Sequence, residues 1–247
     1  MKITTLGTGH GDATATNASS ATLIENQGKF YLIDCADGTE QKLLKAGVEP
    51  AMISAVILTH THFDHSAGLP NLLKRFIKFK RYGRLSPDAD MRCYLPDMRA
   101  ADIIKAWIEL NFFAENLQFS DAANGFSDGN ITVRAFPNLH LGENGKSFSY
   151  KITDGDKTVF YTGDLSANFS DFNLQEANNC DVVISEVTHF PIEKATDLLK
   201  NLKCRKLIFN HISTQLQDIE EQKKILQILS QLPFPVQFAF DGMSFEI

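Results

Sequence analysis

The sequence predicts a layered α/β fold, in which helices cover β-sheets, and three observations support this. Short apolar runs rich in β-branched and aromatic residues recur along the 247 residues. Longer segments with an apolar repeat of about 3.6 residues lie between them. Several of the short runs end on, or lead to, a histidine or an aspartate. Because strands outnumber helices and the two are mixed, we expect a sandwich of sheets with helices on its faces.

The short apolar runs are predicted to be strands, and one pair of them is predicted to form a hairpin. The turn sequence "DGD" at 154–156 separates two of these runs, and Gly155 can supply the positive φ that such a turn needs. The two strands that flank it should therefore be antiparallel. The predicted strands are residues 2–7, 21–26, 29–34, 55–60, 92–96, 131–136, 147–153, 157–164, 181–187, 206–211 and 236–240.

Helices are predicted over residues 39–46, 69–79, 97–113, 193–202 and 219–232. The third of these carries an apolar stripe, which we expect to pack into the core. The stripe consists of Ile103, Ile104, Trp107, Ile108 and Leu110.

The composition is that of an ordinary globular domain. With 43% hydrophobic and 22% charged residues, the chain has enough apolar side chains for a substantial core. Its length is common for layered α/β folds that form one unit. We therefore expect a single domain over residues 1–247.

Charge and hydropathy exclude some classes of partner. The net charge of −6 argues against a protein that coats nucleic acid, because such binding depends on neutralising phosphates with Lys and Arg. The first twenty residues contain no apolar signal segment, and no stretch approaches the ~20 apolar residues of a spanning helix. We expect a cytoplasmic protein without a membrane partner.

The four cysteines are far apart and form no C-x-x-C pair. In a cytoplasmic chain this spacing predicts buried free thiols at Cys35, Cys93, Cys180 and Cys204. A metal ion would then have to be held by histidine and aspartate.

The segment "LTHTHFDHSAG" (58–68) is the strongest local signal for chemistry. It places His60, His62, Asp64 and His65 directly after an apolar run. Neutral imidazole and carboxylate are the usual ligands of zinc and similar ions, so the segment indicates a metal site. The alternative is a polar surface loop.

Three further candidate ligands follow other apolar runs. His140 comes after "ITVRAFPNL", Asp164 ends "KTVFYTGD", and His211 ends "KLIFNH". A single histidine at a strand end is more often a hydrogen-bonded structural residue, but strand ends are also where α/β folds place binding groups. The repetition favours one metal site built from His60, His62, Asp64, His65, His140, Asp164 and His211.

This ordered set resembles the metallo-β-lactamase fold superfamily. The match consists of "THTHFDH" as H-x-H-x-D-H, Asp34 in "FYLIDC" before it, and then His140, Asp164 and His211 in the order of the family. It covers nearly the whole chain. The resemblance implies a four-layered αβ/βα sandwich of two mixed β-sheets.

The resemblance also implies a binuclear hydrolytic site. It assigns His60, His62 and His140 to one divalent cation and Asp64, His65 and His211 to the other, with Asp164 as the bridge. Zinc is the expected metal, with manganese or iron as alternatives, and the nucleophile would be a metal-bound hydroxide. Asp34 is expected to accept a hydrogen bond that orients the loop or a ligand histidine.

Further segments resemble the ribonuclease Z-like phosphodiesterase branch. These are "LGTGHG…TNASS", "DCADGTEQKL", "HSAGLPNLL" and "FNHIS". Flavodiiron enzymes carry Glu in place of His62, and the best-known zinc β-lactamases carry Cys in place of Asp164, so a hydrolase other than a lactamase is favoured. The branch implies a phosphate ester substrate and, by analogy alone, a homodimer.

The chain departs from that branch in two places. Ribonuclease Z enzymes usually carry a long arm for tRNA between the third histidine and the bridging aspartate, whereas residues 141–163 leave no room for one. This favours a small-molecule or nucleotide-like ester over nucleic acid. The H-E-A-T segment corresponds to "SEVTHF", with Ser185 in the place of the histidine, and His189 can substitute as the proton donor. The catalytic candidates are therefore Asp64 and His189.

Two alternative functions keep the same ligands: a thioester or lactone hydrolase, and a metal-binding protein without turnover. The ligands do not distinguish these functions, because the same hydroxide can attack carbon or phosphorus.

Two weaker sequence signals each have two interpretations. The basic segment 74–84 could steer an anionic substrate or be a solvated helix face. The opening "GTGHG" could be a substrate loop, with His10 reaching the site, or a tight turn.

Overall fold

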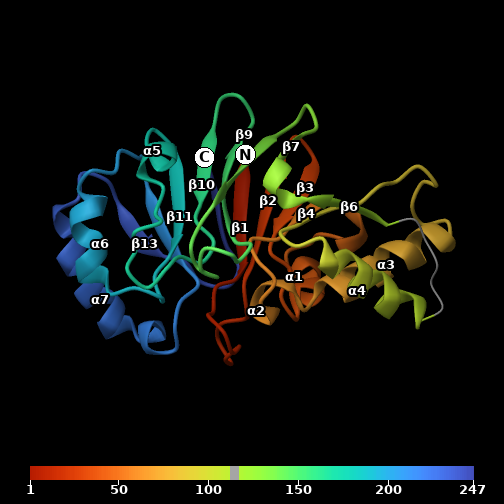
Figure 1. Cartoon of the computed structure of the whole chain (residues 1–247), viewed down its shortest axis with the longest axis horizontal. Coiled ribbons are helices and arrows are strands. Elements are labelled where there is room, and N and C mark those ends of the chain that lie inside the picture. Colours follow the sequence, from red (N-terminus) through yellow and green to blue (C-terminus); the bar gives the residue numbers. More distant parts are fainter. Residues whose placement is uncertain (112–116) are drawn as a thin grey trace.

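The computed structural model describes residues 1–111 and 117–247 and consists of two seven-stranded sheets packed face to face. Figure 1 shows helices on the outer side of each sheet, with α6 and α7 at one end of the view and α3 and α4 at the other. The order of layers is therefore helix, sheet, sheet, helix. This confirms the predicted four-layered αβ/βα sandwich of two mixed β-sheets.

The first sheet has the strand order β14-β1-β2-β3-β4-β5-β6. Strands β14, β1, β2 and β3 pair antiparallel, and β3 to β6 pair parallel. Its strands are β1 (Lys2–Gly7), β2 (Ala21–Asn26), β3 (Lys29–Ile33), β4 (Ile53–Ile57), β5 (Arg92–Leu95), β6 (Gln118–Asp121) and β14 (Met243–Glu246).

The second sheet has the strand order β13-β12-β11-β10-β9-β8-β7. Strands β7 to β10 pair antiparallel, and β10 to β13 pair parallel. The predicted hairpin joins β9 to β10, and Gly155 in its turn has a φ of 101°. The strands are β7 (Phe126–Ser127), β8 (Thr132–Pro137), β9 (Phe148–Thr153), β10 (Thr158–Tyr161), β11 (Val182–Glu186), β12 (Leu207–Asn210) and β13 (Val236–Phe238).

The helices are divided between the two outer faces, and none of those in the described ranges is long and apolar enough to cross a membrane. On the side of the first sheet lie α1 (Thr39–Lys45), α2 (Phe63–Ser66), α3 (Leu69–Arg81) and α4 (Arg99–Glu109). On the side of the second lie α5 (Leu174–Ala177), α6 (Ile192–Leu199) and α7 (Ile219–Ile228). Single 3₁₀ turns occur at Pro50–Met52, Ala122–Asn124, Gln215–Gln217 and Leu229–Gln231.

Three apolar layers hold the sandwich together. The central layer lies between the sheets and includes Ile33 and Ile57 of the first sheet and Tyr150 and Val159 of the second, all nearly inaccessible to solvent. The two outer layers join each sheet to its helices. Since both faces of each sheet are covered, the inner strands read as continuous apolar runs.

Each predicted strand exists, but the strand ends differ from the prediction at the positions that matter for the site. The runs 55–60 and 157–164 were predicted as whole strands, whereas β4 ends at Ile57 and β10 ends at Tyr161. His60 and Asp164 therefore lie in loops just beyond the strands. Strands β6, β7 and β14 and helices α2 and α5 were not predicted, since these elements have only two to four residues.

The prediction for the apolar stripe of the third helix was wrong for three of its residues. Ile103, Trp107 and Leu110 are 69%, 60% and 71% exposed, and only Ile108 is fully buried. Ile104 is partly buried against the layer that joins the first sheet to its helices. The helix is apolar on two sides, and Ala101 and Ile108 mark the side that faces the core. Helix α4 ends at Glu109, and the predicted positions 112–113 lie outside the described residues.

A single carboxylate links the two sheets at one edge. Asp128, between β7 and β8, accepts hydrogen bonds from the Tyr31 hydroxyl at 2.7 Å and the Lys29 ammonium at 3.0 Å, both on β3. Its other oxygen accepts from the backbone N–H groups of Asn130 and Ile131. Burial opposes the charge of Asp128, but these donors prevail and lower its pKa to about 2.

We expect Asp128→Asn to destabilise the protein at neutral pH and much less in acid. The folded pKa lies below the usual 3.8, so the carboxylate contributes stability above about pH 4 and loses it as the pH falls toward about 2. Because the group partly faces solvent, the expected loss at neutral pH is on the order of 1 kcal/mol. Urea unfolding at about pH 7 and about pH 3 measures it. Asp156→Asn, at an exposed turn, is the control, and an equal loss at both pH values would contradict the prediction.

Candidate metal centre

All seven histidines of the sequence converge at one edge of the two sheets. The carboxyl ends of the parallel strands β3, β4, β10, β11 and β12 meet there, and the loops that follow these strands carry most of the candidate residues. His10 reaches the same place from the loop after β1, and His140 from the loop after β8. The seven are His10, His60, His62, His65, His140, His189 and His211.

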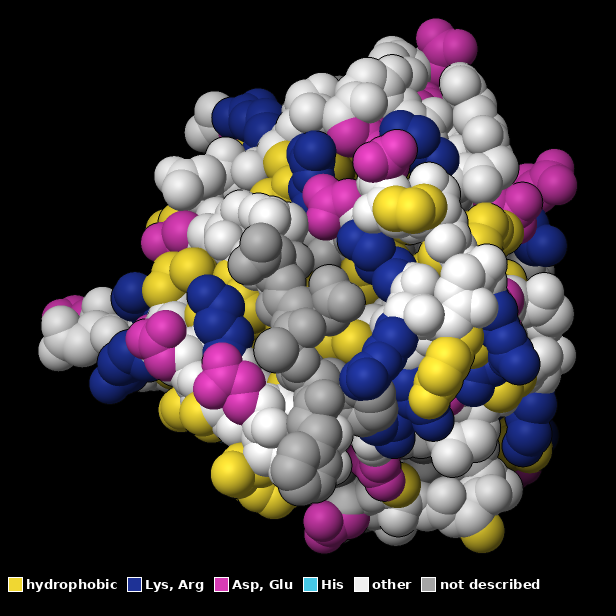
Figure 2. Space-filling model, turned by 90° about the vertical axis from the view of Figure 1, so that its right-hand side faces the viewer, with side chains coloured by type: hydrophobic (Ala, Val, Ile, Leu, Met, Phe, Trp, Pro, Cys, Tyr) yellow, Lys and Arg dark blue, Asp and Glu magenta, His cyan; other side chains and the backbone are white. Residues whose placement is uncertain are grey.

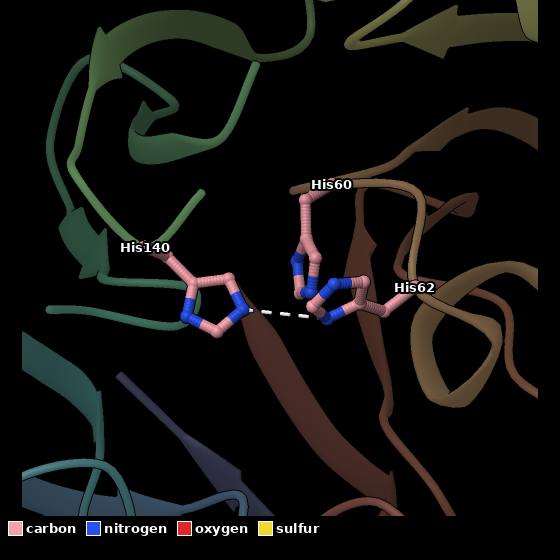
Figure 3. Close-up of side chains that lie close together, drawn as sticks. All are labelled: His60, His62 and His140. Atoms are coloured by element: carbon pink, nitrogen blue, oxygen red, sulfur yellow. Dashed lines mark hydrogen bonds between the residues drawn. The ribbon is translucent and has the colours of Figure 1, made fainter. Parts of the chain in front are cut away.

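The first ligand group consists of His60, His62 and His140. A nitrogen from each lies within 4.8 Å of the others, and Nε2 of His140 is 3.3 Å from Nδ1 of His62. Figure 3 shows these rings converging from two separate loops. Burial, aided by the neighbouring His65, lowers the pKa of His60 to about 2. His60 is therefore a neutral imidazole, the form that binds a metal ion.

The second ligand group consists of Asp64, His65 and His211. Nε2 of His65 lies 3.1 Å from Nε2 of His211, which in turn lies 3.3 Å from Oδ2 of Asp64. Burial tends to raise the pKa of Asp64, but the hydrogen bond from His211 and the charge of His65 outweigh this effect and hold the pKa below its usual range. Asp64 is thus an ionised carboxylate facing two imidazole nitrogens, a donor set that suits a divalent cation.

Asp164 lies between the two groups. Its Oδ2 is 3.8 and 3.7 Å from Nε2 of His60 and His140, and 3.4 and 3.5 Å from Nε2 of His65 and His211. Burial opposes ionisation of Asp164, but the charges of His211 and His65 hold its pKa well below the usual range. The structure thus places the predicted bridging carboxylate within 4 Å of both sets of ligands.

Several buried polar atoms in this cluster lack a hydrogen-bond partner among the described residues. They include Nε2 of His60 and Oδ1 of Asp164. Buried polar atoms are rarely left unpaired, so unpaired nitrogen and oxygen atoms at one place indicate a missing electron-pair acceptor. Divalent cations fit this requirement, and the residues present fit the ions that the resemblance implies.

Asp34 holds His65 of the second group in position. The carboxylate is fully buried, accepts from Nδ1 of His65 at 2.8 Å, and accepts from the backbone N–H of Thr59 at 2.8 Å. Since Nδ1 of His65 is occupied, its Nε2 is directed to the site. The Thr59 hydroxyl also lies 3.1 Å from Nδ1 of His60. Sequence reasoning missed Thr59, although it directly precedes the first ligand.

His189 is the fifth histidine with a ring nitrogen within 4 Å of Asp164, after His60, His65, His140 and His211. Its Nδ1 is 3.0 Å from Oε1 of Glu186 and 3.9 Å from Oδ2 of Asp164. Glu186 is buried and also accepts from the backbone N–H groups of Leu165, Thr188 and His189, so it is firmly placed. Burial opposes a charged ring, but the hydrogen bond and charge of Glu186 raise the pKa of His189. Ser185 instead bonds the Glu186 carbonyl.

The two weaker sequence signals fall in different places. His10 lies beside the second group, with its ring centroid 4.8 Å from that of His211. The basic segment lies at the end of α3, and Figure 2 shows Lys and Arg side chains gathered on the face formed by α3 and α4. Lys74, Lys78 and Arg84 line a surface depression there that contains none of the candidate ligands.

A protein-family profile described as "Anti-Pycsar protein Apyc1" matches residues 1–233. The chain belongs to this family.

Matches to curated proteins are consistent with the expected ribonuclease Z-like branch. The chain is 29% identical over 164 residues to ribonuclease BN from Cronobacter sakazakii, which covers 64% of this chain and 51% of the relative. It is 38% identical over 73 residues to the human zinc phosphodiesterase ELAC protein 1, which covers 30% of this chain and 20% of the relative.

The matches to these curated relatives therefore span a fifth to about half of the relatives' own lengths. Among solved structures, the metallo-β-lactamase fold protein YhfI from Bacillus subtilis superimposes with a TM-score of 0.78 at 22% identity, over 100% of this chain and 99% of that one. This likeness shows that the Apyc1-family chain has the metallo-β-lactamase fold.

We expect Asp34→Asn to weaken metal binding without unfolding the protein. The amide can keep one hydrogen bond to Thr59 but loses the charge that orients and polarises His65, a change that typically costs roughly 10- to 100-fold in metal affinity. Competition with a chromogenic chelator, using apo-protein titrated with zinc, measures this. Asp37→Asn removes an exposed carboxylate three residues away and should bind zinc as the wild type does. Equal affinities in Asp34→Asn and wild type would contradict the prediction.

Proposed function

We propose that this protein is a binuclear metal-dependent phosphodiesterase that hydrolyses a small or nucleotide-like phosphate ester. One observation carries the proposal: Oδ2 of Asp164 has two ligand groups around it, each offering nitrogens within 4 Å. Its position suits a carboxylate that bridges two cations. We assign His60, His62 and His140 to the first cation and Asp64, His65 and His211 to the second.

Zinc is our preferred metal. Imidazole and carboxylate also accept manganese and iron, but the human relative is named a zinc phosphodiesterase. When bound, two such cations lower the pKa of a shared water and polarise the phosphoryl oxygen. We assign Asp64 two roles, as a ligand of one cation and as the acceptor of a hydrogen bond from the attacking water.

His189 is the proposed acid for the leaving group. Glu186 occupies Nδ1 of His189, which leaves Nε2 as the ring atom able to give a proton to substrate. The oxygen of water forms the new bond to phosphorus, the bond to the leaving oxygen breaks, and this oxygen takes the proton of His189. The proton lost by the water restores the charged ring, so atoms and charge balance.

The segment between His140 and Asp164 supports a small substrate. Residues 141–163 form a short loop and then the strands β9 and β10, which belong to the second sheet. An arm for tRNA would have to be inserted there. We therefore favour a small ester as the substrate. We also propose that residues 1–247 act as a single domain. The homodimer remains a prediction by analogy.

Replacing His62 should abolish turnover and remove a metal ion. His62→Ala deletes a ligand of the first cation, so hydrolysis of bis-p-nitrophenyl phosphate should fall by at least about 100-fold. Elemental analysis should show about two metal ions per chain in the wild type and about one in the variant. Thr61→Ala, which trims an exposed neighbour, is the control. Wild-type protein with two metals that hydrolyses thioesters or lactones alone would reject the phosphodiesterase.

Replacing His189 should matter most for esters with poor leaving groups. His189→Gln keeps a side chain of similar length but provides no acid, so phenyl ester turnover should fall by about 10²- to 10⁴-fold. Turnover of the p-nitrophenyl ester should fall by less than about tenfold, because p-nitrophenolate leaves without a proton. Steady-state kinetics with both substrates checks this, with the exposed Glu193→Gln as control. Equal losses for both esters would exclude His189 as the acid.

A further inference from the structure

The opening loop, residues 8–19, is attached directly to the strand end that carries His211. The N–H of Ile212 donates to the carbonyl of Thr8 at 2.7 Å, and the N–H of His10 donates to the carbonyl of Ile212 at 3.2 Å. Gly9 forms β-bridges to both Ile212 and Ser19. His10 is therefore held in register with His211 by main-chain bonds.

A second set of contacts fixes the two ends of this loop. Oδ1 of Asp241 accepts from the backbone N–H of Thr8 at 3.0 Å, and Oδ2 accepts from the backbone N–H of Ala18 at 2.8 Å. Asn17 donates its side-chain amide to the Thr8 hydroxyl at 2.8 Å. The two ends of the loop, and with them the backbone next to His10, are thus held by hydrogen bonds.

His10 lies at the second ligand group. A ring nitrogen lies within 4.8 Å of ligand atoms of Asp64 and His211. The ring meets those of His189 and His211 edge-on, with centroids 5.0 and 4.8 Å apart. Its Nδ1 is buried and has no partner among the described residues. The next residue, Gly11, donates its N–H to Oδ2 of Asp64 at 2.9 Å, so the loop also positions a ligand.

The second cation of the proposed site already has a full set of protein ligands, which favours contact of His10 with the substrate and not with the cation. In the proposed site the second cation already has Asp64, His65, His211 and the bridging Asp164, and a catalytic metal must keep a position open for water or substrate. A further imidazole ligand would close that position. A group that occupies the open position would come within reach of His10.

We infer that His10 is a substrate-binding residue that donates a hydrogen bond to a non-bridging phosphoryl oxygen held at the second cation. This inference rests on the proposed function. A phosphodiester has two such oxygens, whereas a thioester or lactone presents a single carbonyl oxygen that the cations already polarise. The contact therefore selects a tetrahedral, anionic phosphoryl group over a planar acyl group.

The experiment compares His10→Ala and His10→Gln with wild type and with Thr16→Ala, an exposed position in the same loop. The proteins are loaded with zinc, and their metal content, the kinetics of bis-p-nitrophenyl phosphate hydrolysis and the inhibition constant of inorganic phosphate are measured. His10→Ala should raise both KM and the phosphate inhibition constant by roughly tenfold or more with unchanged metal content. His10→Gln, which can still donate, should recover part of the loss.

Three outcomes would overturn the inference. Unchanged KM and phosphate inhibition in His10→Ala would mean that His10 makes no contact with the substrate. Loss of a metal ion from both variants would make His10 a metal ligand. In each case wild-type turnover leaves the proposed function intact. Absence of phosphodiester turnover in the zinc-loaded wild type would instead reject the proposed function and, with it, the role of His10.

Discussion

The buried carboxylate of Asp164 sets the main constraint on this site. An ionised group that is only 2% exposed is costly unless positive charge or hydrogen bonds balance it. Here the balance comes from imidazoles that surround Oδ2, and neutral imidazoles such as His60 provide little of it. In the proposed site, a cation on either side would provide the rest. The position of Asp164 thus determines where both ligand groups must lie and why they come from both sheets.

Two residues of the site have an unusual backbone conformation with a positive φ. Asp34 and His211 have φ values of 60° and 52°, a region that non-glycine residues seldom adopt. Such conformations persist where surrounding contacts determine them. The N–H of Asp34 bonds the carbonyl of Ile57, and the residue after His211 is bonded to the opening loop. The loop after β3, which contains Asp34, also requires a glycine opposite it. A Cβ on Gly68 would lie 2.1 Å from the carbonyl oxygen of Ala36, so only glycine fits where α3 begins next to this loop.

Sequence reasoning predicted the ligand residues better than it predicted the elements that support them. Histidine and aspartate after apolar runs are recognisable because few other roles explain the pattern, and the structure brings all of those residues together. Strands β6 and β7 escaped prediction because edge strands this short and partly exposed carry no apolar alternation. The burial of the apolar stripe of α4 was predicted wrongly, because periodicity shows that a helix is amphipathic but not which apolar side faces the core. Thr59 was missed for a different reason, since its hydrogen bonds to the Asp34 carboxylate depend on folding to bring the two residues together.

In the proposed site, the cation ligands are distinct from the side chains that would select a substrate. Ligands of the same kind would activate water against carbon or phosphorus, so the choice of bond must come from side chains that are not ligands. Among the described residues, two imidazoles that we do not assign as ligands lie at the centre: His10 from the loop after β1, and His189 from the loop after β11. They belong to different sheets, yet their rings lie 5.0 Å apart. In the proposed site, packing of the two sheets against each other would therefore position the substrate-binding side chains as well as the metal ligands, and a change that shifted one sheet against the other would disturb both.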